Sequence, residues 1–223
     1  MVVGQEVPVF SYGKAEIEHL SARDKRMAWA IERIGPVERA VIPDLYEALV
    51  NSIVGQQIST KAHRTIWARM LDRFGRITPE AVAACSDEEL QSFGTTFRKI
   101  AYIHAVTERV LDGSLDLCAL AEKPDTEVLD ELVKLPGVGR WTAEMMLTFS
   151  LQRPDVISYG DLAIQRGMRM LYRHRAITPE LFARYRRRYA PYATVASLYL
   201  WAVAGGALPE LSDPAVRVRT AKR

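Results

Sequence analysis

Signals that start and stop helices recur along nearly the whole chain, and they restrict the fold more than any other feature. A capping residue, a first-turn proline and an acidic residue follow in order in Thr78-Pro79-Glu80 and again in Thr178-Pro179-Glu180. Gly35, Gly75 and Gly113 stand where helical patterns end. Strict alternation of apolar and polar residues, which is typical of strands, is nearly absent. The sequence therefore predicts an all-α protein of about ten short helices.

The helical patterns also place individual elements and one buried segment. We expect a helix that Ser21 caps and Gly35 ends, and another that begins at Asp125. The second of these carries an apolar stripe formed by Val128, Leu129, Leu132 and Val133. The uncharged stretch 193–208 has 16 residues, fewer than the roughly 20 that span a bilayer. It predicts a buried core helix and no contact with a membrane.

Charge is distributed unevenly along a chain of ordinary globular composition. Of the 223 residues, 48% are hydrophobic and 26% are charged, which suffices for one large core or two small ones. Residues 1–161 contain 18 Lys and Arg against 24 Asp and Glu, whereas residues 162–223 contain 12 against 3. The basic excess is densest at 184–189, where arginines are interspersed with tyrosines. Such a segment is either a solvated helix face or a surface that contacts a polyanion.

Disulfide and metal chemistry have little support in the sequence. Cys85 and Cys118 are too few for a disulfide framework or for a metal site of their own. The four histidines are scattered without the spacing of metal ligands, so we read them as structural or surface residues. We expect no cofactor and no metal held by side chains. The first residues lack a basic segment followed by an apolar one, which predicts a cytoplasmic protein.

The most informative motif is the segment 135–143, Leu-Pro-Gly-Val-Gly-Arg-Trp-Thr-Ala, which lies between two predicted helices. Gly137 and Gly139 leave the backbone bare, so amide groups can approach a phosphate at the N-terminus of the following helix. We expect the carbonyl groups at this turn to hold a monovalent cation that offsets phosphate charge. The carbonyls concerned are those of Val133, Leu135 and Val138. A purely structural turn between helices is the alternative.

Residues 135–143 resemble the hairpin of the helix-hairpin-helix DNA glycosylases, and two further segments agree with this resemblance. Asp161 follows the second helix of the motif, in the place where that superfamily has its catalytic carboxylate. Upstream, residues 49–59 (Leu-Val-Asn-Ser-Ile-Val-Gly-Gln-Gln-Ile-Ser) resemble the segment that fills the hole left by an extruded base. The resemblance covers residues 43–206, and it points to the alkylpurine glycosylases of the 3-methyladenine DNA glycosylase II type.

The resemblance implies a fold of two packed helical subdomains with a cleft between them. Residues 45–150 are expected to form the subdomain that carries the wedge segment and the helix-hairpin-helix motif. Residues 1–44 together with 151–223 are expected to form the second, with Asp161 facing the cleft.

Asp161 has two compatible interpretations. It stands where a helix begins, which is a common place for a capping carboxylate. The positive end of that helix favours the ionised carboxylate. Cleavage of an N-glycosidic bond builds positive charge on the sugar, which a fixed carboxylate stabilises while it orients or deprotonates the attacking water. We therefore expect Asp161 to be catalytic.

Trp141 bears on the class of reaction, because bifunctional members of the superfamily have a nucleophilic lysine at the matching position. A tryptophan there predicts hydrolysis without strand cleavage. The iron–sulfur branch is excluded because it needs four clustered cysteines. The resemblance assigns four side chains to the pocket for the extruded base, those of Trp141, Trp201, Met145 and Leu162. For each tryptophan, an ordinary core position is the alternative.

Gln57 matches the position of the wedge that enters the DNA duplex. The alternative is an ordinary exposed amide in a turn before a helix. Contacts with the DNA backbone are expected from five residues of the hairpin, Gly137, Val138, Gly139, Arg140 and Thr142.

These features predict a monofunctional DNA glycosylase of base excision repair, which extrudes and hydrolytically removes alkylated purines from double-stranded DNA and leaves an abasic site. We expect a monomer that acts at the nucleoid of a bacterium or in the nucleus of a eukaryote. Two alternatives stay open: the scaffold removes oxidised, deaminated or mismatched bases, or it binds DNA without catalysis. Asp161 argues against the last, because a pure binding module does not need a carboxylate there.

Overall fold

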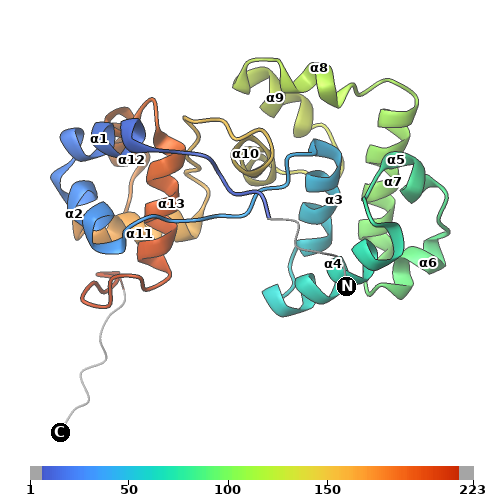
Figure 1. The fold of residues 1–223 in the computed structure, drawn as a ribbon, viewed down its shortest axis with the longest axis horizontal. Coiled ribbons are helices and arrows are strands. Elements are labelled where there is room, and N and C mark those ends of the chain that lie inside the picture. Colours follow the sequence, from blue (N-terminus) through green and yellow to red (C-terminus); the bar gives the residue numbers. More distant parts are fainter. Residues whose placement is uncertain (1–6, 216–223) are drawn as a thin grey trace, which may run out of the picture. The chain divides into compact units, whose positions relative to one another are not determined.

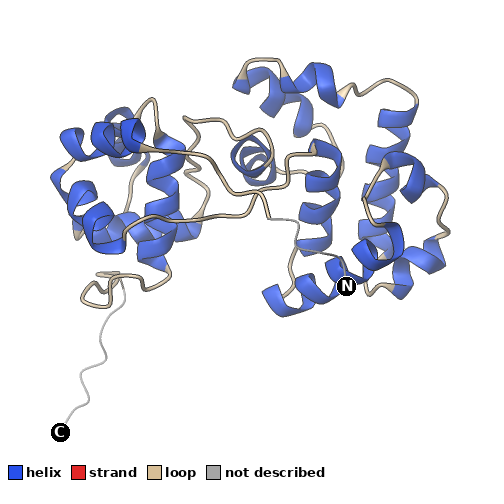
Figure 2. Ribbon diagram, viewed as in Figure 1, coloured by secondary structure: helices blue, strands red, loops and turns tan. Residues whose placement is uncertain are grey.

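The computed structural model describes residues 7–215, and its regular structure is helical (Figure 1, Figure 2). Within that range the chain forms thirteen α-helices and no strand, and Val9 and Ala40 make one isolated antiparallel bridge. The prediction of an all-α fold is confirmed. None of the helices in this part of the chain has the length and apolar character of a membrane span.

The chain divides into two compact units. Unit 1 consists of Met1–Ala40 and Arg153–Arg223, and unit 2 consists of Val41–Gln152. The helices of unit 1 are α1 (Lys14–Arg23), α2 (Lys25–Ile34), α11 (Leu162–Tyr172), α12 (Pro179–Tyr189) and α13 (Ala193–Ala204). Those of unit 2 are α3 (Leu45–Gly55), α4 (Thr60–Phe74), α5 (Pro79–Ala83), α6 (Asp87–Ser92), α7 (Phe97–Leu111), α8 (Leu117–Ala121), α9 (Asp125–Leu132) and α10 (Arg140–Phe149).

Unit 1 is built around α13, which occupies most of the uncharged stretch 193–208. Ten of its 12 residues are buried, so the prediction of a core helix is confirmed. The helix packs against α11, and Gly167 lies where the two approach each other. A Cβ atom at this glycine would stand 2.2 Å from the carbonyl oxygen of Leu200, so any side chain there would force the helices apart.

The first helices of unit 1 differ from the prediction at Ser21. Ser21 lies inside α1, and the chain changes direction at Asp24. The Asp24 carboxylate accepts hydrogen bonds from the amides of Arg26 and Met27, each at 3.0 Å, and thereby caps α2. Because aspartate and serine are equally good N-caps, the helical pattern did not distinguish the two positions. Gly35 follows the end of α2, as predicted.

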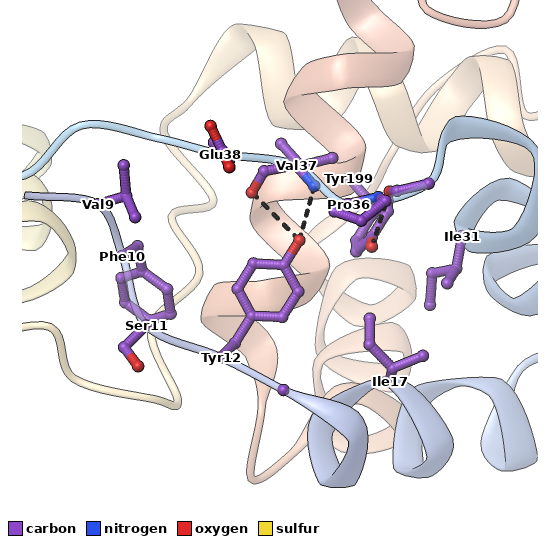
Figure 3. Close-up of a pocket in the computed structure, with 12 residues that line it drawn as sticks. Val9, Phe10, Ser11, Tyr12, Ile17, Ile31, Pro36, Val37, Glu38 and Tyr199 are labelled. Atoms are coloured by element: carbon purple, nitrogen blue, oxygen red, sulfur yellow. Dashed lines mark hydrogen bonds between the residues drawn. The ribbon is translucent and has the colours of Figure 1, made fainter.

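Two tyrosines hold the loop after α2: Tyr12 from the chain before α1, and Tyr199 from α13. The Tyr12 hydroxyl accepts a hydrogen bond from the Val37 amide at 2.7 Å and donates one to the Val37 carbonyl at 3.1 Å (Figure 3). The Tyr199 hydroxyl donates to the Gly35 carbonyl at 3.1 Å. A pocket of about 600 Å³ lies beside these contacts, and none of the predicted site residues lines it.

The basic segment 184–189 forms two faces of α12. Tyr185 and Tyr189 are buried, whereas the four arginines are exposed. Tyr185 stacks on Tyr172 of α11 with the ring centroids 4.1 Å apart, and the hydroxyl oxygens of Tyr172 and Tyr189 are 2.8 Å apart. The tyrosines therefore belong to the core of unit 1, and the arginines form an exposed basic face, on which Arg188 pairs with Asp24 and Arg186 with Asp155.

In unit 2, six successive helices begin with a side-chain cap. In each of the helices α3 to α8, a side-chain oxygen of the N-cap residue accepts a hydrogen bond from a first-turn amide. The capping residues, in chain order, are Asp44, Ser59, Thr78, Ser86, Thr96 and Asp116. The apolar stripe of α9 is narrower than predicted. Val128 and Leu132 are buried, but the helix ends at Leu132, and Val133 is 42% exposed.

Candidate functional site

The turn between α9 and α10 uses its two glycines for different purposes. Gly137 has φ +80°, and a Cβ atom there would stand 2.3 Å from the ring of Tyr102. Any side chain would therefore strain the backbone and displace the tyrosine on which the turn packs. Gly139 has an ordinary φ of −83°, and a Cβ atom there would meet nothing within 4 Å. Of the two glycines, only Gly139 faces open space, so its backbone is the less obstructed of the two.

The N-terminus of α10 has no side-chain cap. Gly139 is the N-cap residue, and no side chain of its own accepts from the first turn. Arg140 pairs with Glu144 through a 3.1 Å contact between Nε and Oε1, while the rest of its side chain is exposed. Thr142 is 6% exposed, so little of it is available to a ligand. Because the first-turn amides carry the positive end of the helix, this N-terminus is suited to an external anion.

The turn between α3 and α4 carries the predicted wedge. Gln57 is exposed and has φ +55°, a left-handed conformation that is uncommon for a residue with a side chain. The preceding residue, Gln56, donates a hydrogen bond from Nε2 to the Gly137 carbonyl at 2.7 Å. The two turns of unit 2 also share a pocket of about 510 Å³, lined by Ser52, Gly55, Gln56, Gln57, His63, Gly137, Trp141 and Thr142.

Two basic side chains hold the end of α3 in front of this turn. The Lys99 ammonium group is buried and donates to the Val54 carbonyl at 2.8 Å, and burial lowers its pKa. The His63 ring lies 3.1 Å from the Asn51 carbonyl, and burial lowers its pKa as well. Lys99 satisfies one of the last four carbonyls of α3, which have no intrahelical partner, and His63 adds a contact to a carbonyl one turn earlier. The structural interpretation of His63 agrees with this contact, whose partner could not be predicted because it is a backbone atom.

In unit 1, the Asp161 carboxylate is fixed by the helix that it begins. Asp161 is the N-cap of α11, and its Oδ1 accepts hydrogen bonds from the amides of Ala163 at 2.8 Å and Ile164 at 2.9 Å. The residue is only 7% exposed. The two amide donors set the direction in which the carboxylate points. The capping interpretation from the sequence is confirmed, and the catalytic interpretation remains a prediction.

The four side chains predicted for a base pocket differ in exposure. Trp141 is 47% exposed and Leu162 is 80% exposed, so both present surface to solvent, whereas Met145 is buried at 7%. Trp201 is half-buried in α13, and the guanidinium carbon of Arg39 lies 5.9 Å from its ring centroid. Arg39 is therefore a neighbour of the predicted pocket residue that sequence reasoning missed.

The predicted residues are distributed over both units. Unit 2 holds Gln57, Gly137, Val138, Gly139, Arg140, Trp141, Thr142 and Met145, and unit 1 holds Asp161, Leu162 and Trp201. The cleft between the units stays a prediction.

Among the described residues no group of three or more His, Cys, Asp or Glu could hold a metal ion. The cation predicted for this turn would bind the carbonyl oxygens of Val133, Leu135 and Val138. The Leu135 carbonyl accepts a hydrogen bond from the Val138 amide at 3.0 Å, which leaves it one lone pair for the cation.

Comparison with known proteins gives relatives that include several DNA-3-methyladenine glycosylases. The chain is 32% identical to DNA-3-methyladenine glycosylase 1 of Schizosaccharomyces pombe over 88% of this chain and 90% of that protein. It is 25% identical to DNA-3-methyladenine glycosylase 2 of Escherichia coli over 73% of this chain and 58% of that protein.

Solved structures agree. A DNA-3-methyladenine glycosidase from Bacillus halodurans superimposes with a TM-score of 0.80 and 39% identity, covering 91% of this chain and 95% of that one. The Schizosaccharomyces pombe 3-methyladenine DNA glycosylase in complex with abasic DNA superimposes with a TM-score of 0.72 and 28% identity, covering 85% and 96%. Residues 50–191 match the model of the HhH-GPD superfamily of base excision DNA repair proteins. The resemblance read from the hairpin is confirmed, and the chain belongs to the HhH-GPD superfamily of base excision DNA repair proteins.

Proposed function

We propose that this protein is a monofunctional DNA glycosylase that extrudes alkylated purines of the 3-methyladenine type from double-stranded DNA and hydrolyses their N-glycosidic bonds. It acts as a monomer on chromosomal DNA, in the cytoplasm of a bacterium or the nucleus of a eukaryote. The names of the relatives support the substrate class, and the site geometry supports the mechanism.

The observation that carries the proposal is the fixed carboxylate of Asp161. A group that stabilises a short-lived cation must already point at it, because reorientation during the reaction would cost part of the stabilisation. Oδ1 is held by two amides, so the carboxylate cannot turn freely. Burial to 7% exposure keeps bulk water from screening its charge.

The reaction breaks the bond between C1′ of the deoxyribose and the purine nitrogen. The electron pair of that bond leaves with the base, so a cationic alkylated purine departs as a neutral molecule. The sugar carries the positive charge in the transition state, beside the Asp161 carboxylate. A water oxygen then bonds to C1′, and its proton passes to the carboxylate or to solvent. The products are the free base and an abasic site.

Binding of the DNA backbone falls to the turn that follows α9. The bare backbone at Gly139 and the uncapped start of α10 support a phosphate contact through amide groups. Val138 and Arg140 flank this position. Contacts of this kind position the duplex without reading its sequence.

The absence of strand cleavage rests on Trp141. β-Elimination needs an amine that forms an imine with the opened sugar, and an indole cannot supply one. Lys134, the nearest lysine in sequence, is paired with Glu131 through a 2.7 Å contact. Borohydride should therefore trap no covalent adduct with the protein while base release proceeds. An adduct that forms as fast as the base is released would contradict the monofunctional assignment.

The test of substrate class is a panel of duplex oligonucleotides, each with one alkylated, oxidised, deaminated or mismatched base, scored for alkali-labile abasic sites. We expect cleavage after alkali or heat at alkylated purines, and none with Asp161→Asn. Faster release of oxidised or deaminated bases would replace the substrate class. Binding without any base release would favour a DNA-binding protein that lacks catalysis.

A further inference from the structure

We propose that Gln56 is a positioning residue whose side-chain amide holds the turn of Gln57 and the turn of Gly139 as one preformed DNA-binding surface. The inference rests on the proposed function and goes beyond it, because it names what joins the wedge to the phosphate-binding backbone. Its basis is the 2.7 Å hydrogen bond from Gln56 Nε2 to the Gly137 carbonyl.

The hydrogen bond joins two segments that lie far apart in the sequence. Gln56 is the C-cap of α3, and its amide donates to the Ile53 carbonyl at 3.3 Å. Gly137 lies 81 residues later, within the turn that precedes α10. Both residues line the same pocket in unit 2, and Gln56 is only partly exposed. A partly buried hydrogen bond to a backbone carbonyl fixes the distance between the two turns more firmly than an exposed one.

The turn of Gln57 needs such support, because its backbone is strained. A left-handed residue with a side chain persists only where its surroundings hold it. On the helix side, Lys99 and His63 hold the carbonyls of Val54 and Asn51. On the hairpin side, the hydrogen bond of Gln56 is the contact that reaches across to the turn of Gly139.

The same contact determines where the hairpin carbonyl points. Gly137 packs against the ring of Tyr102, and its carbonyl accepts a hydrogen bond from the side-chain amide of Gln56. Loss of the amide would leave the Gly137 carbonyl without this donor and let the turn shift relative to Gln57. The two turns would then have to be ordered when DNA binds, and the cost would appear in wedge insertion.

Hydrogen exchange of the free protein tests this coupling without DNA. Gln56→Met keeps an unbranched side chain of similar length and removes the donor, and Gln57→Met is the matched control one residue along. We expect Gln56→Met to raise amide exchange about fivefold in both 55–58 and 136–139, and Gln57→Met to raise neither. Wild-type exchange at 136–139 in Gln56→Met would overturn the proposal.

A second measurement uses duplex DNA with 2-aminopurine beside a tetrahydrofuran abasic analogue, whose fluorescence reports unstacking when a wedge enters. Gln56→Met should lower the inserted fraction about fivefold, a larger loss than any fall in the affinity for intact duplex. Added to Gln57→Ala, it should cause no further loss, since it acts through the turn of Gln57.

The outcomes separate this inference from the proposed function. Additive effects of the two substitutions, or a parallel fall in duplex affinity and unfolding midpoint, would show that Gln56 acts only as a structural residue. A wild-type protein that releases no base from any lesion would contradict the proposed function. The exchange data on the free protein would still decide the role of Gln56.

Discussion

Two helices of this protein begin in opposite ways. The N-terminus of α11 is closed by its own residue, because the Asp161 carboxylate accepts hydrogen bonds from two first-turn amides. The N-terminus of α10 follows Gly139 and has no side-chain cap. Both helix ends carry the same partial positive charge from the backbone. At α11 this charge interacts with the Asp161 carboxylate, whereas at α10 no side-chain cap interacts with it.

On the proposed function, the same electrostatic feature would serve two steps of the reaction. At α11 the helix end orients a negative group that belongs to the protein, which suits stabilisation of a cation in the transition state. At α10 the helix end has no side-chain cap, which would suit binding of an anion from another molecule, such as a phosphate of the DNA backbone. Changes at α11 should therefore alter the rate of base release, and changes at α10 should alter affinity.

The largest effect is expected from Asp161→Asn. Asparagine also caps helices, so α11 should keep its stability while the charge is lost. We expect the single-turnover rate of base release to fall at least about a hundredfold, and DNA affinity to hold or rise. Asp24→Asn at the start of α2 is a control cap variant in unit 1 and should leave the rate unchanged. Normal turnover of Asp161→Asn would refute the assignment.

Gly139→Asp would convert the start of α10 into the kind found at α11. An aspartate cap should raise the free energy of unfolding by about a few tenths of a kcal/mol, because it satisfies first-turn amides. It should also weaken DNA binding about thirtyfold, since it occupies and repels the position of a phosphate. Fluorescence anisotropy and chemical denaturation would measure the two. Unchanged affinity would mean that the phosphate lies elsewhere.

Comparing Gly139→Ala with Gly137→Ala tests the separate roles of two glycines that are two residues apart and differ in their surroundings. Gly139→Ala should lower DNA affinity about fivefold through steric hindrance of close approach, with little change in stability. Gly137→Ala should lower the free energy of unfolding by at least about 1–2 kcal/mol, because of its positive φ and the contact with Tyr102. If both variants lost stability equally, the assignment of Gly139 to ligand approach would be wrong.

The smallest effect concerns the pH dependence of stability that arises from His63, which lies in α4 and contacts the end of α3. Burial lowers the pKa of His63 below its ordinary value, so the unfolded chain binds this proton more readily than the folded chain. The contribution of His63 to stability is therefore fully present above about pH 6.5 and decreases as the pH falls. The difference in unfolding free energy between wild type and His63→Gln should shrink from about pH 8 to about pH 5. A constant difference would contradict the role of burial.

Sequence reasoning reached the parts of this comparison that are local. The start of α11 at Asp161 could be predicted, because a capping residue and the helix it begins are adjacent in the chain. The two glycines of the turn were visible, but their separate roles were not. The positive φ of Gly137 and the packing of Tyr102 against it distinguish the two, and neither leaves a periodic pattern in the sequence. The bond from Gln56 and the position of Arg39 over Trp201 were missed for the same reason.

The most direct test of the central claim is a single-turnover titration of base release against protein concentration, on duplex DNA with one alkylated purine. Wild type, Asp161→Asn and Gly139→Asp would be compared under one salt condition, because affinity depends on salt. Asp161→Asn should lower the maximal rate and leave the half-saturating concentration unchanged or lower. Gly139→Asp should raise the half-saturating concentration and leave the maximal rate near that of wild type. If both variants changed the same parameter, the division of labour between the two helix ends would be refuted.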